Sequence, residues 1–300
     1  VQNLVMNIYR NIDRHKVQFD FFVYAKVSVS FEEEILAMGG RVVYPGRVKA
    51  IGLPRFLGQL YLTIRRGKYD AVHSHTGLNS GPILLLAKLA GVKIRIAHSH
   101  GTYTSNEIMK SFMPVWRALT LNCATKLLAA SQEAGRFLFK ESHFAVFPNG
   151  LEIRRFMDEN VGEEAILRHR IGMEDDMLVL GHVGRFSPEK NHRFLVRIAC
   201  ILRDRRIPFK MILVGDGELK EEIMGLVRYL NLGDDLYFAG AQRSVEIYYR
   251  LFDILLFPSL HEGFGNVALE AQLAKNRVIA SNEVSCNTGH GLEENNRIPR

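Results

Sequence analysis

Residues 178–192 read LVLGHVGRFSPEKNH, and this stretch decides the class of fold. It opens with a mainly apolar run, passes through a glycine turn at Gly184 and leads into a helix expected from Asn191 to Arg205. A continuous apolar run without polar alternation is typical of a parallel strand that helices cover on both faces. The stretch therefore predicts one strand–turn–helix unit of an α/β domain.

The same alternation of short apolar runs and helical stretches extends along the rest of the chain. Strands are expected at residues 19–24, 41–44, 71–74, 94–98, 126–130 and 145–148, and again at 178–183, 209–214, 236–239, 254–258 and 277–280. Helices are expected at residues 31–38, 54–65, 82–90, 114–122, 191–205, 218–230, 244–251 and 266–274, three of them opening with proline. The pattern pauses at the turn signal PNG of residues 148–150, and a charged linker follows from Glu152 to His169. Two Rossmann-like domains, residues 1–150 and 151–300, are therefore expected, with ligands at the carboxyl ends of their strands.

Composition narrows the class of protein. The chain has 300 residues, of which 47% are hydrophobic, and a formal net charge of +7. This charge suits an anionic partner such as nucleotide phosphates, nucleic acid or an acidic membrane surface. The sequence contains no basic arm interleaved with aromatic residues, so nucleic-acid binding is disfavoured. Its three cysteines form no CxxC pair, and no apolar run reaches the length of a bilayer span, so a reduced cytoplasmic protein without a metal centre is expected.

The turn within residues 178–192 carries two cations. Arg185 and Lys190 follow Gly184, which lets the backbone turn tightly. Both stand between the carboxyl end of a strand and the start of a helix, whose dipole favours anions. Two cations at such a point suit a diphosphate, although a loop with two solvated charges is the commoner outcome for these residue types. This motif alone leaves both interpretations open.

A second glycine turn follows the next expected strand, at Gly215-Asp216-Gly217. Strand, glycine turn and helix are generic for Rossmann-like units, so a structural turn and a ligand loop are equally compatible with it. The chain contains no GxGxxG fingerprint, which disfavours a dinucleotide-dependent dehydrogenase.

Residues 258–271 read PSLHEGFGNVALEA and combine two carboxylates with a helix start. Glu262 lies in the loop after a strand, and Glu270 lies one turn inside the helix that follows. Helical side chains lean toward the N-terminus, so both carboxylates can converge on one molecule, one on its sugar and one on its ribose hydroxyls. The helix start offers the backbone N–H groups of Gly265, Asn266 and Val267, which could hold a phosphate. The alternative, a surface glutamate on a helix, is disfavoured because apolar residues flank Glu270.

Together these segments resemble the retaining glycosyltransferases of family 4, also called group 1, which have the GT-B fold. The resemblance is closest to members that build capsular polysaccharides and exopolysaccharides. It covers nearly the whole chain and rests on Gly-Arg-x4-Lys followed by Glu-x7-Glu. It implies that Arg185 and Lys190 bind the donor diphosphate. It also implies that Glu262 contacts the transferred sugar and Glu270 binds the ribose. The base-binding region implied by the resemblance consists of Phe238, Ala239 and Gly240.

Histidines end two neighbouring strands of the first half. Residues 73–75 and 98–100 both read HSH, and the carboxyl ends of these strands are expected to face the cleft. The resemblance implies that a histidine of this domain contacts the sugar. His100, which precedes Gly101, is preferred over His98. A lone histidine at a strand end is usually structural, but two parallel pairs at one edge point to function.

The resemblance has gaps at both ends of the sequence. The family begins with a strand and a glycine-rich loop, whereas this sequence starts about where the following helix is expected, at Val1 to Tyr9. After Ser281 the sequence is polar and lacks periodicity, where the family continues with further strands and helices. Both domains are therefore expected to be truncated, and the chain as given is expected to bind a nucleotide with little or no turnover. Asn276 is expected to take the left-handed cap that closes the helix after Glu270.

The expected activity is transfer of a sugar from a nucleoside-diphosphate sugar, most simply a UDP-sugar, to a glycan or lipid-linked saccharide. Retention of configuration is implied by the resemblance, and no metal or other cofactor is expected because no Asp-x-Asp sequence is present. The basic cluster from Arg65 to Lys68 suggests peripheral contact with the anionic inner face of the plasma membrane. A sugar-nucleotide epimerase of the same fold and a non-catalytic nucleotide-sugar-binding module remain open alternatives.

Overall fold

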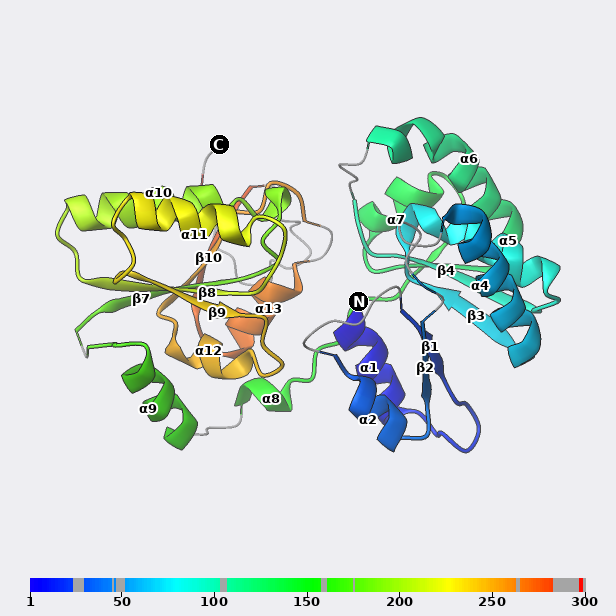
Figure 1. Cartoon of the computed structure of the whole chain (residues 1–300), viewed down its shortest axis with the longest axis horizontal. Coiled ribbons are helices and arrows are strands. Elements are labelled where there is room, and N and C mark those ends of the chain that lie inside the picture. The colour runs from blue at the N-terminus through cyan, green and yellow to red at the C-terminus, as the bar shows by residue number, and fades with distance from the viewer. Residues whose placement is uncertain are drawn as a thin grey trace. The chain divides into compact units, whose positions relative to one another are not determined.

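The computed structural model describes residues 1–23, 30–44, 46, 52–102, 107–157, 161–174, 176–262, 265–282 and 297–298. The chain divides into two compact units, Val1–Gly150 and Leu151–Arg300. In each unit, parallel strands are flanked by helices (Figure 1). The α/β class expected from the continuous apolar runs is therefore confirmed.

In its described residues, the first unit contains two parallel sheets. Its elements are α1 (Gln2–Asn11), β1 (Asp20–Phe22), α2 (Glu32–Ala37), β2 (Arg41–Val43), α4 (Leu53–Gly67), β3 (Ala71–Ser74), η1 (Gly77–Asn79), α5 (Ser80–Leu89), β4 (Ile94–Ser99), α6 (Glu107–Cys123), β5 (Lys126–Ala129), α7 (Gln132–Phe139) and β6 (Ala145–Val146). β3, β4, β5 and β6 form one sheet in that order, and β1 pairs with β2. In the register of β3 and β4, Ser74 lies beside Ala97, so the ends of both strands lie at the same edge.

One helix of the first unit begins earlier than predicted. The helix expected at residues 114–122 is α6, which starts at Glu107 and contains Pro114 in its interior. Pro114 has no N–H to donate to the carbonyl four residues back, so local preference alone favours a helix start there. Close packing between α5 and α6 offsets that preference, since a Cβ atom at Gly81 would lie only 2.6 Å from the carbonyl oxygen of Trp116.

The second unit is built on one parallel sheet. Its elements are α8 (Arg154–Met157), α9 (Val161–Arg170), β7 (Leu178–Val183), η2 (Pro188–Lys190), α10 (His192–Asp204), β8 (Phe209–Val214), α11 (Lys220–Tyr229), β9 (Leu236–Gly240), α12 (Glu246–Leu251), β10 (Ile254–Phe257), α13 (Asn266–Leu273), β11 (Arg277–Ser281) and β12 (Arg297–Ile298). The strand order is β12-β11-β10-β7-β8-β9, which is the Rossmann order 3-2-1-4-5-6 read from the other edge. The order therefore reverses between β7 and β10, and ligands of such sheets bind outside the carboxyl ends of these two strands.

Separate apolar cores cover the two faces of this sheet. On one face, α10 and α11 contribute buried residues such as Leu195 and Ile223. On the other, α9, α12 and α13 contribute Leu167, Tyr249 and Ala271. Figure 1 shows α10 and α11 above the strands and α12 and α13 below them. Coverage on both faces explains why the strands read as continuous apolar runs.

Three local predictions in this unit need correction. The stretch expected as a linker at residues 152–169 forms the helices α8 and α9 in its described part, and Leu167 anchors α9 to the core. The left-handed residue after α13 is Lys275, with a φ of 64°, and not Asn276. The Asn276 side chain instead donates from Nδ2 to the backbone oxygens of Tyr249 and Phe252, at 2.8 and 2.7 Å. The tail expected to lack periodicity also holds the short strand β12, which pairs with β11.

Candidate functional site

The loops after β7 and β10 meet at the point where the strand order of the second unit reverses. Lys190 Nζ, at the end of the first loop, bonds to Glu262 Oε2 in the second. The backbone joins the loops as well, because Leu260 N–H donates to the Glu189 oxygen over 2.8 Å. Two of the residues expected to bind the donor are thus brought together at the predicted edge of the sheet.

This ion pair is largely enclosed. The Lys190 side chain is 16% exposed and that of Glu262 is 17% exposed. Lys190 Nζ also lies 5.2 Å from the centre of the Phe257 ring, which adds a cation–π contact to its surroundings. A lysine ammonium with so little water around it depends on an anion to balance its charge.

Arg185 lies in a more open environment. Its side chain is 70% exposed and bonds to Glu218 Oε2 over 2.9 Å, with Glu218 itself 50% exposed. A pair this exposed contributes little to stability because water screens it. Arg185 can therefore change partner easily when an anion reaches the loop.

The glycines of the second turn have a structural role. A Cβ atom at Gly215 would lie 1.9 Å from the backbone oxygen of Gly184, and one at Gly217 would lie 2.4 Å from that of Phe186. The turn after β8 is thus pressed against the turn that carries Arg185. Of the two interpretations left open for this motif, the close packing supports a structural turn that shapes the cation-bearing loop.

The helix start expected to hold a phosphate is present. Gly265 caps α13 in the left-handed region, with a φ of 73°, and the helix runs from Asn266 through Val267 to Leu273. N–H groups in a first helical turn have no carbonyl four residues back within the helix, so this end favours anions. It follows the same strand, β10, that leads to Glu262.

Glu270 has a different partner from Glu262. It is 7% exposed, and its Oε2 accepts a 2.8 Å hydrogen bond from the Tyr249 hydroxyl. Burial raises the pKa of Glu270, while the bond from Tyr249 and the charge of Arg155 act in the opposite direction. Burial also raises the pKa of the Tyr249 hydroxyl well above its usual value, so the tyrosine stays a donor. The sequence does not point to Tyr249, since it lies on α12, a separate helix.

The predicted base-binding residues Phe238, Ala239 and Gly240 form the half-buried end of β9. The backbone oxygen of Gly240 accepts from Gly215 N–H over 2.9 Å, which ties this end to the turn after β8. The Ala239 oxygen accepts from Gln242 Nε2 over 2.6 Å. The end of β9 is therefore held in a fixed position beside the turns described above.

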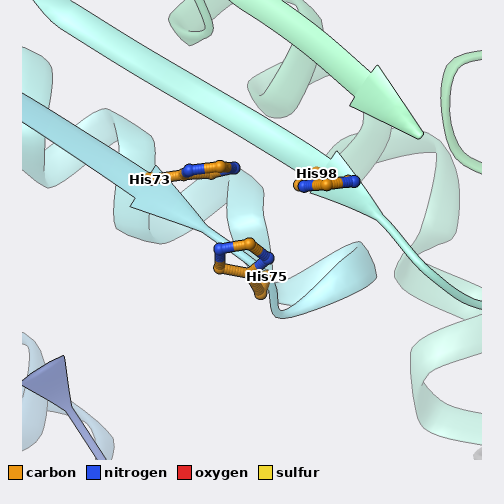
Figure 2. A group of neighbouring side chains, drawn as sticks. All are labelled: His73, His75 and His98. Carbon is orange, nitrogen blue, oxygen red and sulfur yellow. The ribbon is translucent and has the colours of Figure 1, made fainter. Parts of the chain in front are cut away.

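The first unit gathers four histidines at the ends of β3 and β4. Figure 2 shows the rings of His73, His75 and His98 close together at these strand ends. His75 Nδ1 and His100 Nε2 lie 2.9 Å apart in a hydrogen bond. The ring centres of His98 and His100 are 4.1 Å apart. His98 is fully buried, whereas His100 is half-buried, so only the latter has part of its surface open to a ligand.

These histidines are kept neutral by their surroundings. Burial lowers the pKa of His98 to about 4, with His73 adding to the effect. Burial and then the neighbouring His98 lower the pKa of His100 to about 3. For His75, burial together with the other three rings brings the pKa to about 2. The cluster thus offers neutral imidazoles near pH 7, which can accept or donate hydrogen bonds or ligate a metal.

Two further histidines lie beneath the cation-bearing loop of the second unit. His182 is buried and its Nδ1 lies 2.9 Å from the Leu256 backbone oxygen. His192 stacks on Phe186, with ring centres 4.0 Å apart. Burial lowers the pKa of His182 to about 3 and that of His192 to about 4. Neither histidine is marked by a motif in the sequence, although both lie inside residues 178–192.

In the part of the chain that the structure describes, no helix is both long and apolar enough to cross a bilayer.

The chain matches two models of protein families. The one described as Glycosyltransferase Family 4 matches residues 1–155, and the one described as Glycosyl transferases group 1 matches residues 164–289. The putative glycosyltransferase EpsF of Bacillus subtilis (strain 168) is 37% identical in an alignment that covers 97% of this chain and 78% of EpsF.

A more distant relative has a more detailed name. The UDP-Gal:alpha-D-GlcNAc-diphosphoundecaprenol alpha-1,3-galactosyltransferase of Escherichia coli is 29% identical, over 74% of this chain and 60% of its own length. Among solved structures, Anabaena Alr3699/HepE in complex with UDP and glucose has a TM-score of 0.73 at 19% identity, over 94% of this chain and 76% of that one. At that identity the likeness concerns the fold.

Proposed function

Because this chain belongs to the family 4, or group 1, glycosyltransferases and has their GT-B fold of two Rossmann-like units, we propose that it transfers a sugar from a UDP-sugar to a hydroxyl group. The acceptor hydroxyl belongs to a glycan or lipid-linked saccharide, and the transfer retains the configuration of the sugar. The observation that carries the proposal is the meeting of Lys190 and Glu262 at the switch point of the second sheet. The uridine donor is supported by the UDP bound to HepE and by the UDP-galactose in the name of the Escherichia coli relative.

In this proposal the diphosphate lies between the cations Arg185 and Lys190 and the start of α13. The charge that develops on the leaving UDP is then stabilised by two cations and by backbone N–H groups already in position. Glu262 contacts the transferred sugar, Glu270 the ribose, and the end of β9 the base. Transfer proceeds without a metal ion, and a donor phosphate oxygen takes the proton of the acceptor hydroxyl.

In the first unit, His100 is the residue that we assign to the sugar. Its partly open ring supports this choice over the fully buried His98. A neutral imidazole suits a hydrogen bond to a sugar hydroxyl, and burial holds His100 neutral by lowering its pKa to about 3. His98 then supports the ring of His100 from behind.

A lipid-linked acceptor and a role in cell-surface polysaccharide synthesis complete the proposal. The diphosphoundecaprenol in the name of the Escherichia coli relative supports such an acceptor. An enzyme with this acceptor works at a membrane surface, and the basic residues at the end of α4, among them Arg65 and Arg66, suit anionic lipid at the inner face. Co-sedimentation with anionic and neutral vesicles at low salt tests this, and equal pelleting with both would contradict it.

The central experiment is a donor screen followed by a transfer assay. Thermal shifts with UDP-glucose, UDP-galactose, GDP-mannose and ADP-glucose identify the base, and we expect stabilisation by UDP-sugars only. The preferred donor is then incubated with a lipid-linked saccharide, with and without EDTA, and the anomer of the product is read by NMR. Binding without transfer would favour a nucleotide-sugar-binding module if a version extended at both ends with the corresponding segments of a relative is also inactive. Interconversion of UDP-sugars without an acceptor would favour an epimerase.

A further inference from the structure

The four histidines of the first unit arise from a simple geometric rule. Side chains two residues apart in a strand point to the same face, so each HSH segment places two imidazoles on one side of the sheet. β3 and β4 are parallel neighbours, and Ser74 pairs with Ala97. The ends of the two HSH segments therefore lie side by side, and the rings of His73 and His98 stack with centres 5.4 Å apart.

Three of these side chains offer nitrogen atoms at the separation of a metal site. One ring nitrogen from each of His73, His75 and His98 lies within 4.8 Å of the other two. Tetrahedral zinc with bonds of about 2.0–2.1 Å places its ligand atoms roughly 3.4 Å apart, so the rings would have to rotate toward one another when an ion binds. Figure 2 shows the rings of His73 and His98 near the ends of β3 and β4, with the ring of His75, just past β3, beside them.

His98 supplies an independent reason to look for a ligand. It is fully buried, and its polar contact with the backbone of Phe147 falls short of hydrogen-bond geometry, so both ring nitrogens lack a well-formed hydrogen bond. A buried imidazole without a well-formed hydrogen bond loses its bonds to water on folding and gains none in return, which destabilises the folded chain. Such groups are rare in native proteins and often mark a bound ion or water. A metal ion bound by one of the two nitrogens would supply the missing partner.

The hydrogen bond between His75 and His100 fits the same interpretation. In the tautomer in which His75 Nδ1 donates to His100 Nε2, the other nitrogen of His75 keeps its lone pair for a metal. A ligating imidazole that donates its second N–H to an outer partner is the usual arrangement around zinc. His73 is exposed, which gives an ion a path from solvent.

We propose that His73, His75 and His98 bind one divalent transition-metal ion of the class that prefers imidazole, such as Zn²⁺, Co²⁺ or Ni²⁺, with His100 as an outer partner and solvent in the fourth position. The ion is not a participant in sugar transfer. Because its site includes the residues that support His100, occupancy inhibits transfer. This second statement rests on the proposed function, whereas metal binding itself does not.

Direct titration of the 300-residue chain with Co²⁺ tests whether the site binds a metal ion. We expect one Co²⁺ per chain by calorimetry, with the visible absorption of a four-coordinate ion, and displacement by Zn²⁺. His73→Asn, His75→Asn and His98→Asn should each weaken binding by at least about tenfold, the lower limit for loss of even an outer partner. His143→Asn is the matched control, because His143 is an exposed histidine of the same unit outside the cluster.

Each outcome bears on one statement. Binding that survives in the three cluster variants, or that falls equally in His143→Asn, would overturn the site. His98→Asn carries a risk of misfolding because His98 is buried. If His98→Asn and His73→Asn give different results, the variant at the exposed His73 decides.

In the transfer assay, Zn²⁺ should inhibit the wild-type chain, EDTA should restore its activity, and His73→Asn should resist Zn²⁺. Equal Zn²⁺ inhibition of both chains would overturn the inhibitory statement. A chain that binds Co²⁺ at this site but transfers no sugar, even when extended at both ends with the corresponding segments of a relative, would leave the metal site intact and count against the proposed function.

Discussion

Lys190 and Glu262 neutralise one another across the point where the strand order of the second sheet reverses. Both side chains are mostly enclosed, at 16% and 17% exposure, and the Lys190 ammonium forms a direct salt bridge with the Glu262 carboxylate. Our proposal assigns these residues to different parts of the donor, the diphosphate and the sugar. A UDP-sugar that binds here therefore has to separate them, so the pair opposes binding of the diphosphate and releases Glu262 when the sugar arrives.

This competition predicts opposite effects of Glu262→Gln on two ligands. UDP alone should bind about 1 kcal/mol more tightly, roughly fivefold, because Lys190 loses its charged competitor. The UDP-sugar should bind less well relative to UDP, and transfer should slow, because the sugar loses a carboxylate. Calorimetry with both ligands measures the difference.

Glu218→Gln is the control for that experiment. It removes the partner of Arg185, but this pair is 70% and 50% exposed and is already screened by water. UDP affinity should therefore change much less than in Glu262→Gln. If Glu262→Gln lost affinity for UDP and UDP-sugar to the same extent, the division of roles between Lys190 and Glu262 would be refuted.

Removal of either cation should weaken nucleotide binding. Arg185→Ala and Lys190→Ala should each cost about 1.5–3 kcal/mol of UDP binding, the range for a charge-assisted hydrogen bond. Arg193→Ala is a matched control, since Arg193 on α10 forms a similarly exposed pair with Glu222 at 2.6 Å. Unchanged UDP affinity in both loop variants, with circular dichroism showing an intact fold, would exclude the diphosphate site.

Tyr249 should matter both for stability and for the ribose site. Tyr249→Phe removes the 2.8 Å bond to the buried Glu270 carboxylate and leaves that carboxylate without this donor. The free energy of unfolding should fall by about 1–3 kcal/mol, the cost of an unsatisfied buried polar group. UDP binding should weaken as well, because the carboxylate is less firmly placed. Tyr229→Phe, at an 83% exposed position, should change neither quantity.

The sequence predicted the strands and the cation-bearing loop because both are local features. Continuous apolar runs indicate buried parallel strands, and the spacing from Arg185 to Lys190 is set within one turn. The partners of these residues are not local. Nothing near Glu270 in the sequence indicates Tyr249, which lies 21 residues earlier on another helix. The pairing of Lys190 with Glu262 spans 72 residues and depends on the order of the strands.

The local sequence predicted the wrong helix boundary where tertiary packing opposes the preference of a single residue. Pro114 marks a helix start by its own chemistry, but α6 continues through it because α5 approaches closely at Gly81. In the first unit, the two HSH segments predicted histidines at one edge. Only the register of β3 against β4 determines that His73 and His75 approach His98.

His192 links the local packing of the second unit to pH. Its ring stacks on Phe186, with 1% of the residue exposed, and neither nitrogen makes a hydrogen bond. Burial, and then the charge of Lys190, lower its pKa to about 4 from the ordinary 6.5. The unfolded chain therefore takes up a proton at higher pH than the folded chain. The stability associated with neutral His192 is complete above about pH 6.5 and falls as the pH drops toward 4.

His192→Phe should make the second unit less sensitive to acid. Phenylalanine keeps the flat ring against Phe186 and cannot be protonated. From these two pKa values, the wild-type chain should lose about 2 kcal/mol of unfolding free energy between pH 8 and pH 5 through this residue alone. Urea denaturation at both pH values should show that the variant loses about 2 kcal/mol less. The exposed His169→Asn should keep the wild-type pH dependence. The comparison uses the change in unfolding free energy between the two pH values, because the packing cost of the substitution is the same at both. An identical pH dependence in His192→Phe and wild type would rule out His192 as the source of the acid sensitivity.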